Sequence, residues 1–203
     1  MSQPRTAVLL SDGPDSIVGT PGSDTLSGGG GNDTLCGEAG IDKIKGGDGF
    51  DSLSGDEGGD ELIGDAGRDS IHGGDGLDHL YGGDGTDYLY GEGDNDWLYG
   101  DAGVDSLFGG DGQDEMNGGA DMDVLLGGNG NDWLIGGAGI DVLHGDDGND
   151  SLYGQDGGID MIFGDAGNDT AWVDGGYGGD VSRDPPSLLN EWKRITGTEN
   201  VNF

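Results

Sequence analysis

The sequence predicts an all-β solenoid of about nine coils, and three regularities support this prediction. An aspartate recurs at every ninth position along most of the chain, an apolar residue stands two positions after it, and glycines fill most of the positions before it. Residues 73–81 (GGDGLDHLY) and 82–90 (GGDGTDYLY) show the unit twice in succession. Self-similarity at such a fixed period is typical of solenoid proteins, in which each repeat is one short structural unit.

The repeat is counted most easily from these residues, which we call the signature aspartates. They are Asp15, Asp24, Asp33, Asp42, Asp51, Asp60, Asp69, Asp78, Asp87, Asp96, Asp105, Asp114, Asp123, Asp132, Asp141 and Asp150, followed after one extra residue by Asp160 and Asp169. Together they define 18 units. The apolar residues two positions later are Ile17, Leu26, Leu35, Ile44, Leu53, Leu62, Ile71, Leu80, Leu89, Leu98, Leu107, Met116, Leu125, Leu134, Leu143, Leu152 and Ile162, and only the last unit has Ala171 instead.

Each unit is expected to form a six-residue turn and a three-residue strand. Side chains alternate across a strand, so the middle residue of each triplet points inward and its neighbours point outward. A strand this short needs equivalent strands stacked on it, and two consecutive units take the chain once around the coil. At roughly 4.8 Å per coil, 18 units make a rod about 40 Å long.

The composition excludes a thick hydrophobic core and several classes of partner. The 203 residues include 50 glycines, only 31% are hydrophobic, and 7 Lys plus Arg stand against 42 Asp plus Glu, which gives a formal net charge of −35. Repulsion between like charges opposes a compact state, so the metal-free chain is expected to be expanded or disordered. Nucleic acids and acidic membranes are therefore poor partners, and multivalent cations are good ones.

Cysteine content and hydropathy narrow the cellular setting. Cys36 is the only cysteine, so no disulfide can form within the chain. No run approaches the roughly 18 apolar residues of a membrane-spanning helix. The apolar cluster at residues 7–10 is too short for the core of a signal peptide. We therefore expect that any export proceeds without a cleaved N-terminal signal.

Both ends of the chain lie outside the repeat array, which we assign to residues 13–172. Residues 1–12 form a polar lead-in or cap whose apolar residues are expected to add a first strand. Residues 173–203 include four apolar residues at helical spacing, Leu188, Leu189, Trp192 and Ile195. We expect a short amphipathic helix there, between Ser187 and Gly197, that covers the open end of the array as a C-terminal cap.

The turns offer the ligands that calcium prefers. Calcium takes six to eight oxygen ligands, from carboxylates and backbone carbonyls, in a flexible arrangement. Each turn supplies one signature aspartate and several carbonyls beside glycines. Turns two units apart lie one above the other, so Asp78 is expected to meet Asp60 and Asp96. Two facing turns would then complete one coordination shell.

The number of turns also matches the charge. Eighteen turns stacked in this way leave 16 gaps, and full occupancy by up to about 16 calcium ions would add about 32 positive charges to a chain of net charge −35. Magnesium fits these turns less well than calcium because it requires a tight octahedral arrangement of its ligands. Zinc lacks its usual ligands in a chain with one cysteine and three histidines. We expect those histidines, His72, His79 and His144, to be surface residues without a metal role.

These residues and spacings resemble the RTX (repeats-in-toxin) calcium-binding nonapeptide repeat family over roughly residues 13–172. The resemblance implies a right-handed parallel β-roll with calcium between successive turns. The ligands would be the side chains of the signature aspartates from Asp24 to Asp169 and turn carbonyls such as those of Gly73, Gly74, Asp75 and Gly76. It also implies type I export from a Gram-negative bacterium, with an uncleaved signal in the C-terminal segment and folding outside the cell.

The outward positions become aromatic or aliphatic in the second half of the array, and their parity sorts them onto two faces. One face holds Tyr88, Tyr90, Phe108, Val124, Leu126 and Phe163, and the other holds Tyr81, Trp97, Tyr99, Trp133, Ile135, Tyr153 and Trp172. Rings in adjacent coils can stabilise the array by stacking. A long exposed apolar row can also mark a contact surface, here for a polysaccharide or for a second rod.

Three functions stay open at this stage. No Gly-x-Ser-x-Gly or His-Glu-x-x-His motif occurs, so we expect a protein that is not an enzyme. The first function is a secreted structural or folding module that depends on calcium, and it is the one we favour. The second is a carbohydrate-binding or adhesive module that uses the aromatic faces. The third is a C-terminal piece of a larger secreted toxin or hydrolase.

Overall fold

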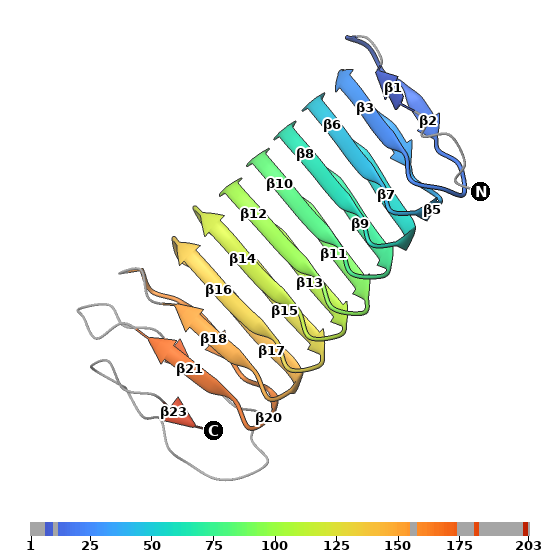
Figure 1. Cartoon of the computed structure of the whole chain (residues 1–203). Helices are drawn as coiled ribbons and strands as arrows, with labels where there is room; N and C mark the ends of the chain where they lie inside the picture. Colours follow the sequence, from blue (N-terminus) through green and yellow to red (C-terminus); the bar gives the residue numbers. More distant parts are fainter. Residues whose placement is uncertain (1–6, 10–11, 155–157, 174–180, 183–200, 203) are drawn as a thin grey trace.

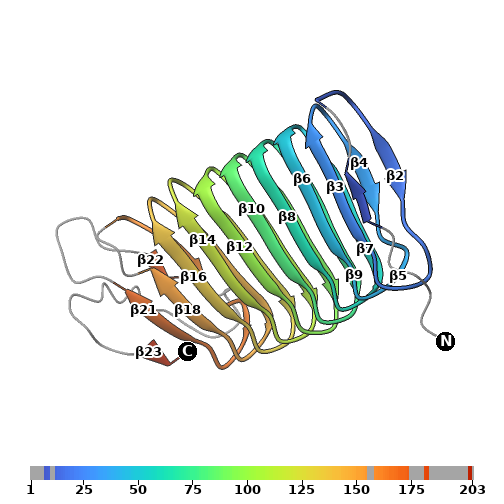
Figure 2. The same cartoon turned by 45° about the horizontal axis from the view of Figure 1, so that its top comes forward.

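The computed structural model of the protein describes residues 7–9, 12–154, 158–173, 181–182 and 201–202. These residues form a parallel β-solenoid in which strands of two sheets alternate along the chain (Figure 1). A view turned by 45° shows the coils stacked one on the next from the N-terminal to the C-terminal end (Figure 2). The predicted all-β solenoid is therefore confirmed.

The first sheet, sheet A, has 11 strands, and from β1 to β21 each strand pairs with the strand two units later in the chain. Its strands are β1 (Ala7–Leu9), β3 (Thr25–Gly30), β6 (Lys43–Gly49), β8 (Glu61–Gly67), β10 (His79–Gly85), β12 (Trp97–Gly103), β14 (Glu115–Ala120), β16 (Trp133–Ala138), β18 (Ser151–Gly154), β21 (Thr170–Val173) and β23 (Val201–Asn202). Neighbours pair in parallel, except that β23 runs antiparallel to β21.

The second sheet, sheet B, has 12 strands and contains the alternate units. They are β2 (Ser16–Val18), β4 (Thr34–Cys36), β5 (Ala39–Gly40), β7 (Ser52–Gly58), β9 (Ser70–Asp75), β11 (Tyr88–Gly93), β13 (Ser106–Asp111), β15 (Val124–Asn129), β17 (Val142–Gly148), β19 (Met161–Phe163), β20 (Ala166–Gly167) and β22 (Val181–Ser182). The short strands β5 and β20 pair with β7 and β17 beside the main ladder.

Most strands are longer than the three residues expected from the sequence. β10 has seven residues, and its register with β12 runs from His79 opposite Trp97 to Gly85 opposite Gly103. The pairing continues into the turn because the strict 18-residue period stacks each turn directly on its equivalent. Backbone groups of the turns can therefore hydrogen-bond to the next coil, as strand residues do.

The core is one column of apolar side chains, as predicted. The residue two positions after each signature aspartate, from Leu26 to Ala171, is at most 1% exposed, and Ile17 at the end of the column is 7% exposed. Burial of one such side chain contributes roughly 1.5–3 kcal/mol. The thin column holds the two sheets together without the thick core that the composition excludes.

Glycine is required where the turn backbone adopts a left-handed conformation and meets the coil below it. At Gly76, φ is 140°, and a methyl group there would overlap the carbonyl oxygen of Gly58. An acidic residue replaces the second glycine of several turns and keeps a positive φ, as at Asp146 (65°) and Asp165 (64°). Aspartate tolerates this region better than most residues.

The structure describes more of the N-terminal end of the chain than of the C-terminal end. β1 pairs in parallel with β3, so the lead-in adds a strand to the array as expected. The helix expected between residues 187 and 197 lies outside the described residues, and the described part contains no helix. It accordingly contains no helix that could span a membrane.

The extra residue near position 157 shifts the spacing between coils from 18 to 19, yet β17 still pairs with β19, Val142 opposite Met161.

Outward aromatic rings stack along both sheets. Tyr90 lies on Phe108 in sheet B, with ring centroids 4.9 Å apart and planes 5° from parallel. In sheet A, Tyr153 lies between Trp133 and Trp172, at 4.9 and 4.1 Å. Rings such as Tyr90 and Tyr153, which have a ring on both sides, thus have both faces covered by their neighbours. The stacking interpretation of these residues is confirmed, and such pairs add about 0.5–1.5 kcal/mol each.

Candidate metal centre

Signature aspartates of successive coils form two buried columns, one at each edge where the chain passes from sheet to sheet. The backbone N–H of Asp60 donates to Oδ1 of Asp78 over 2.7 Å, and the N–H of Asp78 donates to Oδ1 of Asp96 over 2.9 Å. The other column repeats the contact from Asp69 to Asp87, over 2.8 Å. The predicted stacking of turns two units apart is therefore confirmed at the level of the aspartates.

The second carboxylate oxygen of most signature aspartates, Oδ2, is buried and accepts no hydrogen bond. This holds for Asp33, Asp42, Asp51, Asp60, Asp69, Asp78, Asp87, Asp96, Asp105, Asp114, Asp123, Asp132 and Asp150, and also for Asp15 at the N-terminal end. A buried carboxylate oxygen without a donor is costly. The same unpartnered oxygen recurs in most turns, which indicates a regular binding position for a cation rather than a local packing defect.

Most of these oxygens lie beside a carbonyl from the next coil. The first glycine of a turn marks the place: a methyl group added to Gly73 would lie 2.5 Å from Oδ2 of Asp78 and 2.9 Å from the carbonyl oxygen of Gly91. The equivalent position at Gly82 has Oδ2 of Asp87 at 2.7 Å. Carboxylate and carbonyl oxygens from two coils thus converge where a side chain would fill the space, and this donor set suits calcium.

Burial raises the pKa of these carboxyl groups. The pKa of Asp96 rises to about 8, mainly because burial removes water from the carboxylate and then because Asp78 and Asp114 carry like charges nearby. The pKa of Asp69 rises to about 7 and that of Asp78 to about 6, again chiefly through burial. Near neutral pH a metal-free column is therefore unfavourable, and a divalent cation would relieve both the burial cost and the repulsion.

The predicted ligands are not all equivalent in the structure. Every signature aspartate from Asp24 to Asp169 is at most 3% exposed. Asp24 differs because its Oδ2 accepts hydrogen bonds from the N–H and Oγ1 of Thr20, over 2.6 and 2.9 Å. The carbonyl oxygen of Gly73 lies close to Oδ2 of Asp60, on either side of the space that a side chain at Gly55 would fill.

The other three turn residues singled out from the sequence lie in the strand ladder. Gly74 and Asp75 pair with Asp56 and Glu57 of the preceding coil. Gly76 has the left-handed backbone described above, and its N–H donates to the carbonyl oxygen of Gly93 over 3.4 Å. Their carbonyls stay predicted calcium ligands, whereas the carbonyl of Gly73 lies beside the carboxylate of Asp60.

A family model of the RTX calcium-binding nonapeptide repeat, four copies long, matches residues 11–44, 37–71, 54–89, 63–98, 90–125, 126–158 and 156–180. Together these matches cover residues 11–180 without a gap, which is most of the chain. The chain belongs to the RTX calcium-binding repeat family. No curated protein matches it along its sequence. RTX repeats bind calcium in general, and the unpartnered oxygens of the two columns are the candidate ligands in this chain.

A second set of polar contacts in this RTX array was not expected from the sequence. We number the positions of a unit from the first glycine of the pair, so that the signature aspartate is position 6. A side chain at position 9 contacts an acid at position 2 of the next coil, as in Lys45 with Asp65 (2.7 Å) and His72 with Glu92 (2.8 Å). Sequence reasoning missed these pairs, although a spacing of 20 residues between a donor at position 9 and an acid at position 2 would have found them.

Cys36 belongs to the same set. Its Sγ donates to Oδ2 of Asp56 over 2.9 Å, and burial together with this carboxylate raises the pKa of the thiol to about 11. Cys36 is thus a half-buried, protonated thiol with a hydrogen-bond partner.

Proposed function

We propose that this protein is a secreted, non-enzymatic module whose folding is coupled to calcium bound between stacked turns. The observation that carries the proposal is the convergence of an unpartnered Asp Oδ2 and a glycine carbonyl from the next coil, as at Asp78 and Gly91. The ligands would be the signature aspartates from Asp24 to Asp169 and the turn carbonyls, with up to about 16 ions in the full array.

The residues of the chain explain why folding would wait for calcium. The net charge of −35 opposes any compact state, and the two columns bring carboxylates into direct succession within it. The one apolar column is thin compared with the core of an ordinary domain. Calcium, when bound, supplies the positive charge that the chain lacks, so binding free energy becomes folding free energy.

This coupling suits export through a narrow channel. A chain that stays expanded at the low calcium concentration of a cytoplasm can be threaded outward, and it would fold where calcium is abundant. Type I export is typical of the family and supports this part of the proposal. The expected uncleaved signal falls in residues 173–203, most of which lie outside the described residues.

The first test is a calcium titration of the chelated protein followed by far-UV circular dichroism. We expect a cooperative gain of β signal with calcium and none with magnesium at the same concentration, because magnesium demands an octahedron that carbonyls of a stacked turn do not supply. A chain that is already folded in chelator would overturn the coupling. Calcium would then be an accessory to a fold held by its apolar column.

The aromatic faces support stability more than recognition. A sugar stacks on the open face of a ring, but Tyr90 and Phe108 cover each other, as do Tyr153 and Trp172. We therefore assign these rows to the cohesion of the coils. Trp133, at 47% exposed, is the residue to substitute by alanine when testing for glycan binding, with the circular dichroism spectrum in calcium as the control for folding.

A further inference from the structure

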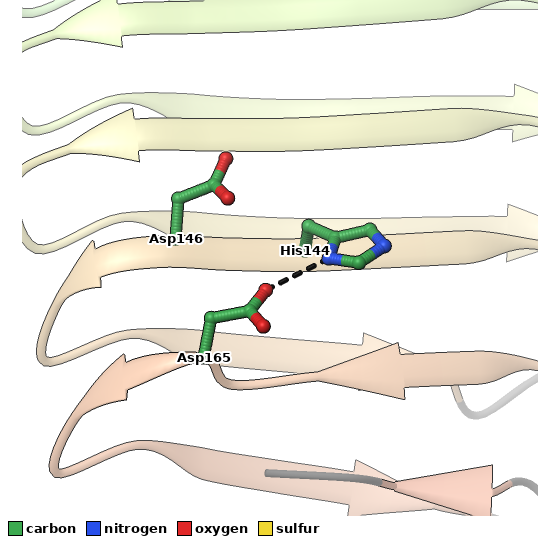
Figure 3. Close-up of side chains that lie close together, drawn as sticks. All are labelled: His144, Asp146 and Asp165. Carbon is green, nitrogen blue, oxygen red and sulfur yellow. Dashed lines mark hydrogen bonds and ion pairs between the residues drawn. The ribbon is translucent and has the colours of Figure 1, made fainter. Parts of the chain in front are cut away.

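The outer surface of sheet B carries a second group of metal-ligating side chains, separate from the buried aspartate columns. His144 and Asp146 lie on β17, and Asp165 lies one coil further, between β19 and β20 (Figure 3). Nδ1 of His144 and Oδ2 of Asp165 are 2.7 Å apart. One ligand atom from each of the three residues lies within 4.8 Å of the other two.

The repeat itself builds this group. Residues two apart in a strand share a face, so His144 at position 9 and Asp146 at position 2 both point outward. The stacking of coils then brings Asp165, at position 2 of the next coil, beside them. An acid at position 2 of two stacked coils is needed, and the His72 pair shows the difference: the equivalent of Asp146 is Gly74, so His72 faces the single carboxylate of Glu92.

The imidazole of His144 is held in place before any ion arrives. Its ring stacks on Phe163, with centroids 4.4 Å apart and planes 10° from parallel. Stacking fixes the ring plane and turns Nδ1 toward Asp165. The side chains of His144 and Asp165 are 33% and 29% exposed. An ion can therefore reach them from solvent, and little water has to be removed from them when it binds. Such preorganisation reduces the cost of binding.

An acidic hollow leads to these residues. It has a volume of about 710 Å³, and its lining includes Glu92, Asp111 and Asp147 together with Asp146 and Asp165. Carboxylates gathered around a depression concentrate cations near it. The carboxylates around the hollow would therefore attract cations from a distance, and His144, Asp146 and Asp165 would coordinate the ion.

We propose that His144, Asp146 and Asp165 bind a divalent transition metal, with zinc the best match, at a site distinct from the calcium turns. Calcium and magnesium prefer oxygen ligands, whereas an imidazole nitrogen beside two carboxylates suits zinc. Zinc bound about 2.1 Å from each ligand would place tetrahedral ligands about 3.4 Å apart, which side-chain rotation can reach from the observed spacing. Water would fill the fourth position. The sequence-based expectation that His144 has no metal role is replaced by this proposal.

The test is zinc binding by isothermal titration calorimetry, on the full chain saturated with calcium, with the absorption spectrum of cobalt as a second readout of geometry. His144→Phe keeps the stacking on Phe163, because phenylalanine stacks in the same way in the Tyr90–Phe108 pair. We expect it to weaken zinc binding at least about tenfold. Asp146→Gly with Asp165→Gly puts at both positions the residue that stands at position 2 in units such as that of Gly74, and it should abolish the site.

His72→Phe is the matched control, since it makes the same substitution at a histidine that also stacks on an aromatic ring, Tyr90. It should leave zinc affinity unchanged. Equal zinc binding by all variants would overturn the proposal, because zinc would then bind to the acidic surface in general. Loss of the zinc signal in a large excess of calcium would overturn it as well. Circular dichroism in calcium shows separately whether each variant is folded, so failure here is distinguishable from failure of calcium-coupled folding.

Discussion

Asp78→Asn tests whether the buried carboxylate oxygens hold calcium. Asparagine retains an oxygen that accepts the N–H of Asp60, a hydrogen bond of 2.7 Å in the structure. It replaces the unpartnered Oδ2 with an NH₂ group, which can donate to the nearby carbonyl of Gly91. The substitution thus preserves the contact between coils and removes one charged ligand.

The effect should change sign with calcium. In saturating calcium, loss of a charged ligand costs on the order of 2–3 kcal/mol. At roughly 2–4 °C per kcal/mol, thermal unfolding followed by circular dichroism should show a Tm lower by about 4–12 °C. In chelator, burial raises the pKa of Asp78 from 3.8 to about 6. The uncharged asparagine would then remove an electrostatic cost of folding of at most about 3 kcal/mol, so the β signal that remains in chelator should rise.

Asp75→Asn is the matched control in the same turn. Asp75 is exposed, and the substitution removes the same charge while the backbone carbonyl stays in place. Its effect should be within about 0.5 kcal/mol, or about 2 °C in Tm. If both variants lower the Tm in calcium equally, the total charge matters and ligation by Oδ2 does not, and the assignment of the aspartate columns fails.

Three further predictions address the core, the turn backbone and the pH dependence. Leu89→Ala should lower stability in calcium by about 2–5 kcal/mol, because Leu89 is fully buried, whereas Leu77→Ala, at a residue 54% exposed, should change it little; urea unfolding measures both. Gly76→Ala should destabilise by more than about 1 kcal/mol, because the left-handed backbone strains alanine and the methyl group meets Gly58, whereas Glu92→Gly should stabilise slightly in the same assay. In chelator, the folded pKa of Asp96, about 8, lies above its ordinary value of 3.8, so the folded chain binds the proton more tightly. Metal-free β structure, measured by circular dichroism, should therefore increase as the pH falls from about 8 to about 4, and β content that rises with pH in chelator would contradict the burial of these carboxylates.

The repeat allowed the fold and the aspartate columns to be predicted in detail. Alternation along a strand decides which residue points inward, and the structure buries Leu80 and its equivalents completely. The period of nine also decides which turns face each other, so the contacts of Asp78 with Asp60 and Asp96 followed from counting alone. Both results depend only on backbone geometry, which a strict period determines.

Side-chain contacts between coils were not predicted, because they depend on pairs of residues from two coils and not on the single unit. The sequence places His144 and Asp165 21 residues apart, with an insertion between them, and nothing in the single unit shows that they meet. The strands proved longer than expected for a related reason. Hydrogen bonding of the turn backbone, as between Gly76 and Gly93, exists only once the coils are stacked.

The constant register between coils has a consequence for how the length of this protein can change. Removal of 18 residues, such as 73–90, would shorten the rod by roughly 4.8 Å and rejoin each sheet in its own register. Removal of nine residues would move every later unit to the opposite sheet, so that Trp97 and Tyr99 would stand above the residues of sheet B. The length of the array can therefore change in steps of two repeats, because gain or loss of a whole pair keeps the outward residues of both sheets in register.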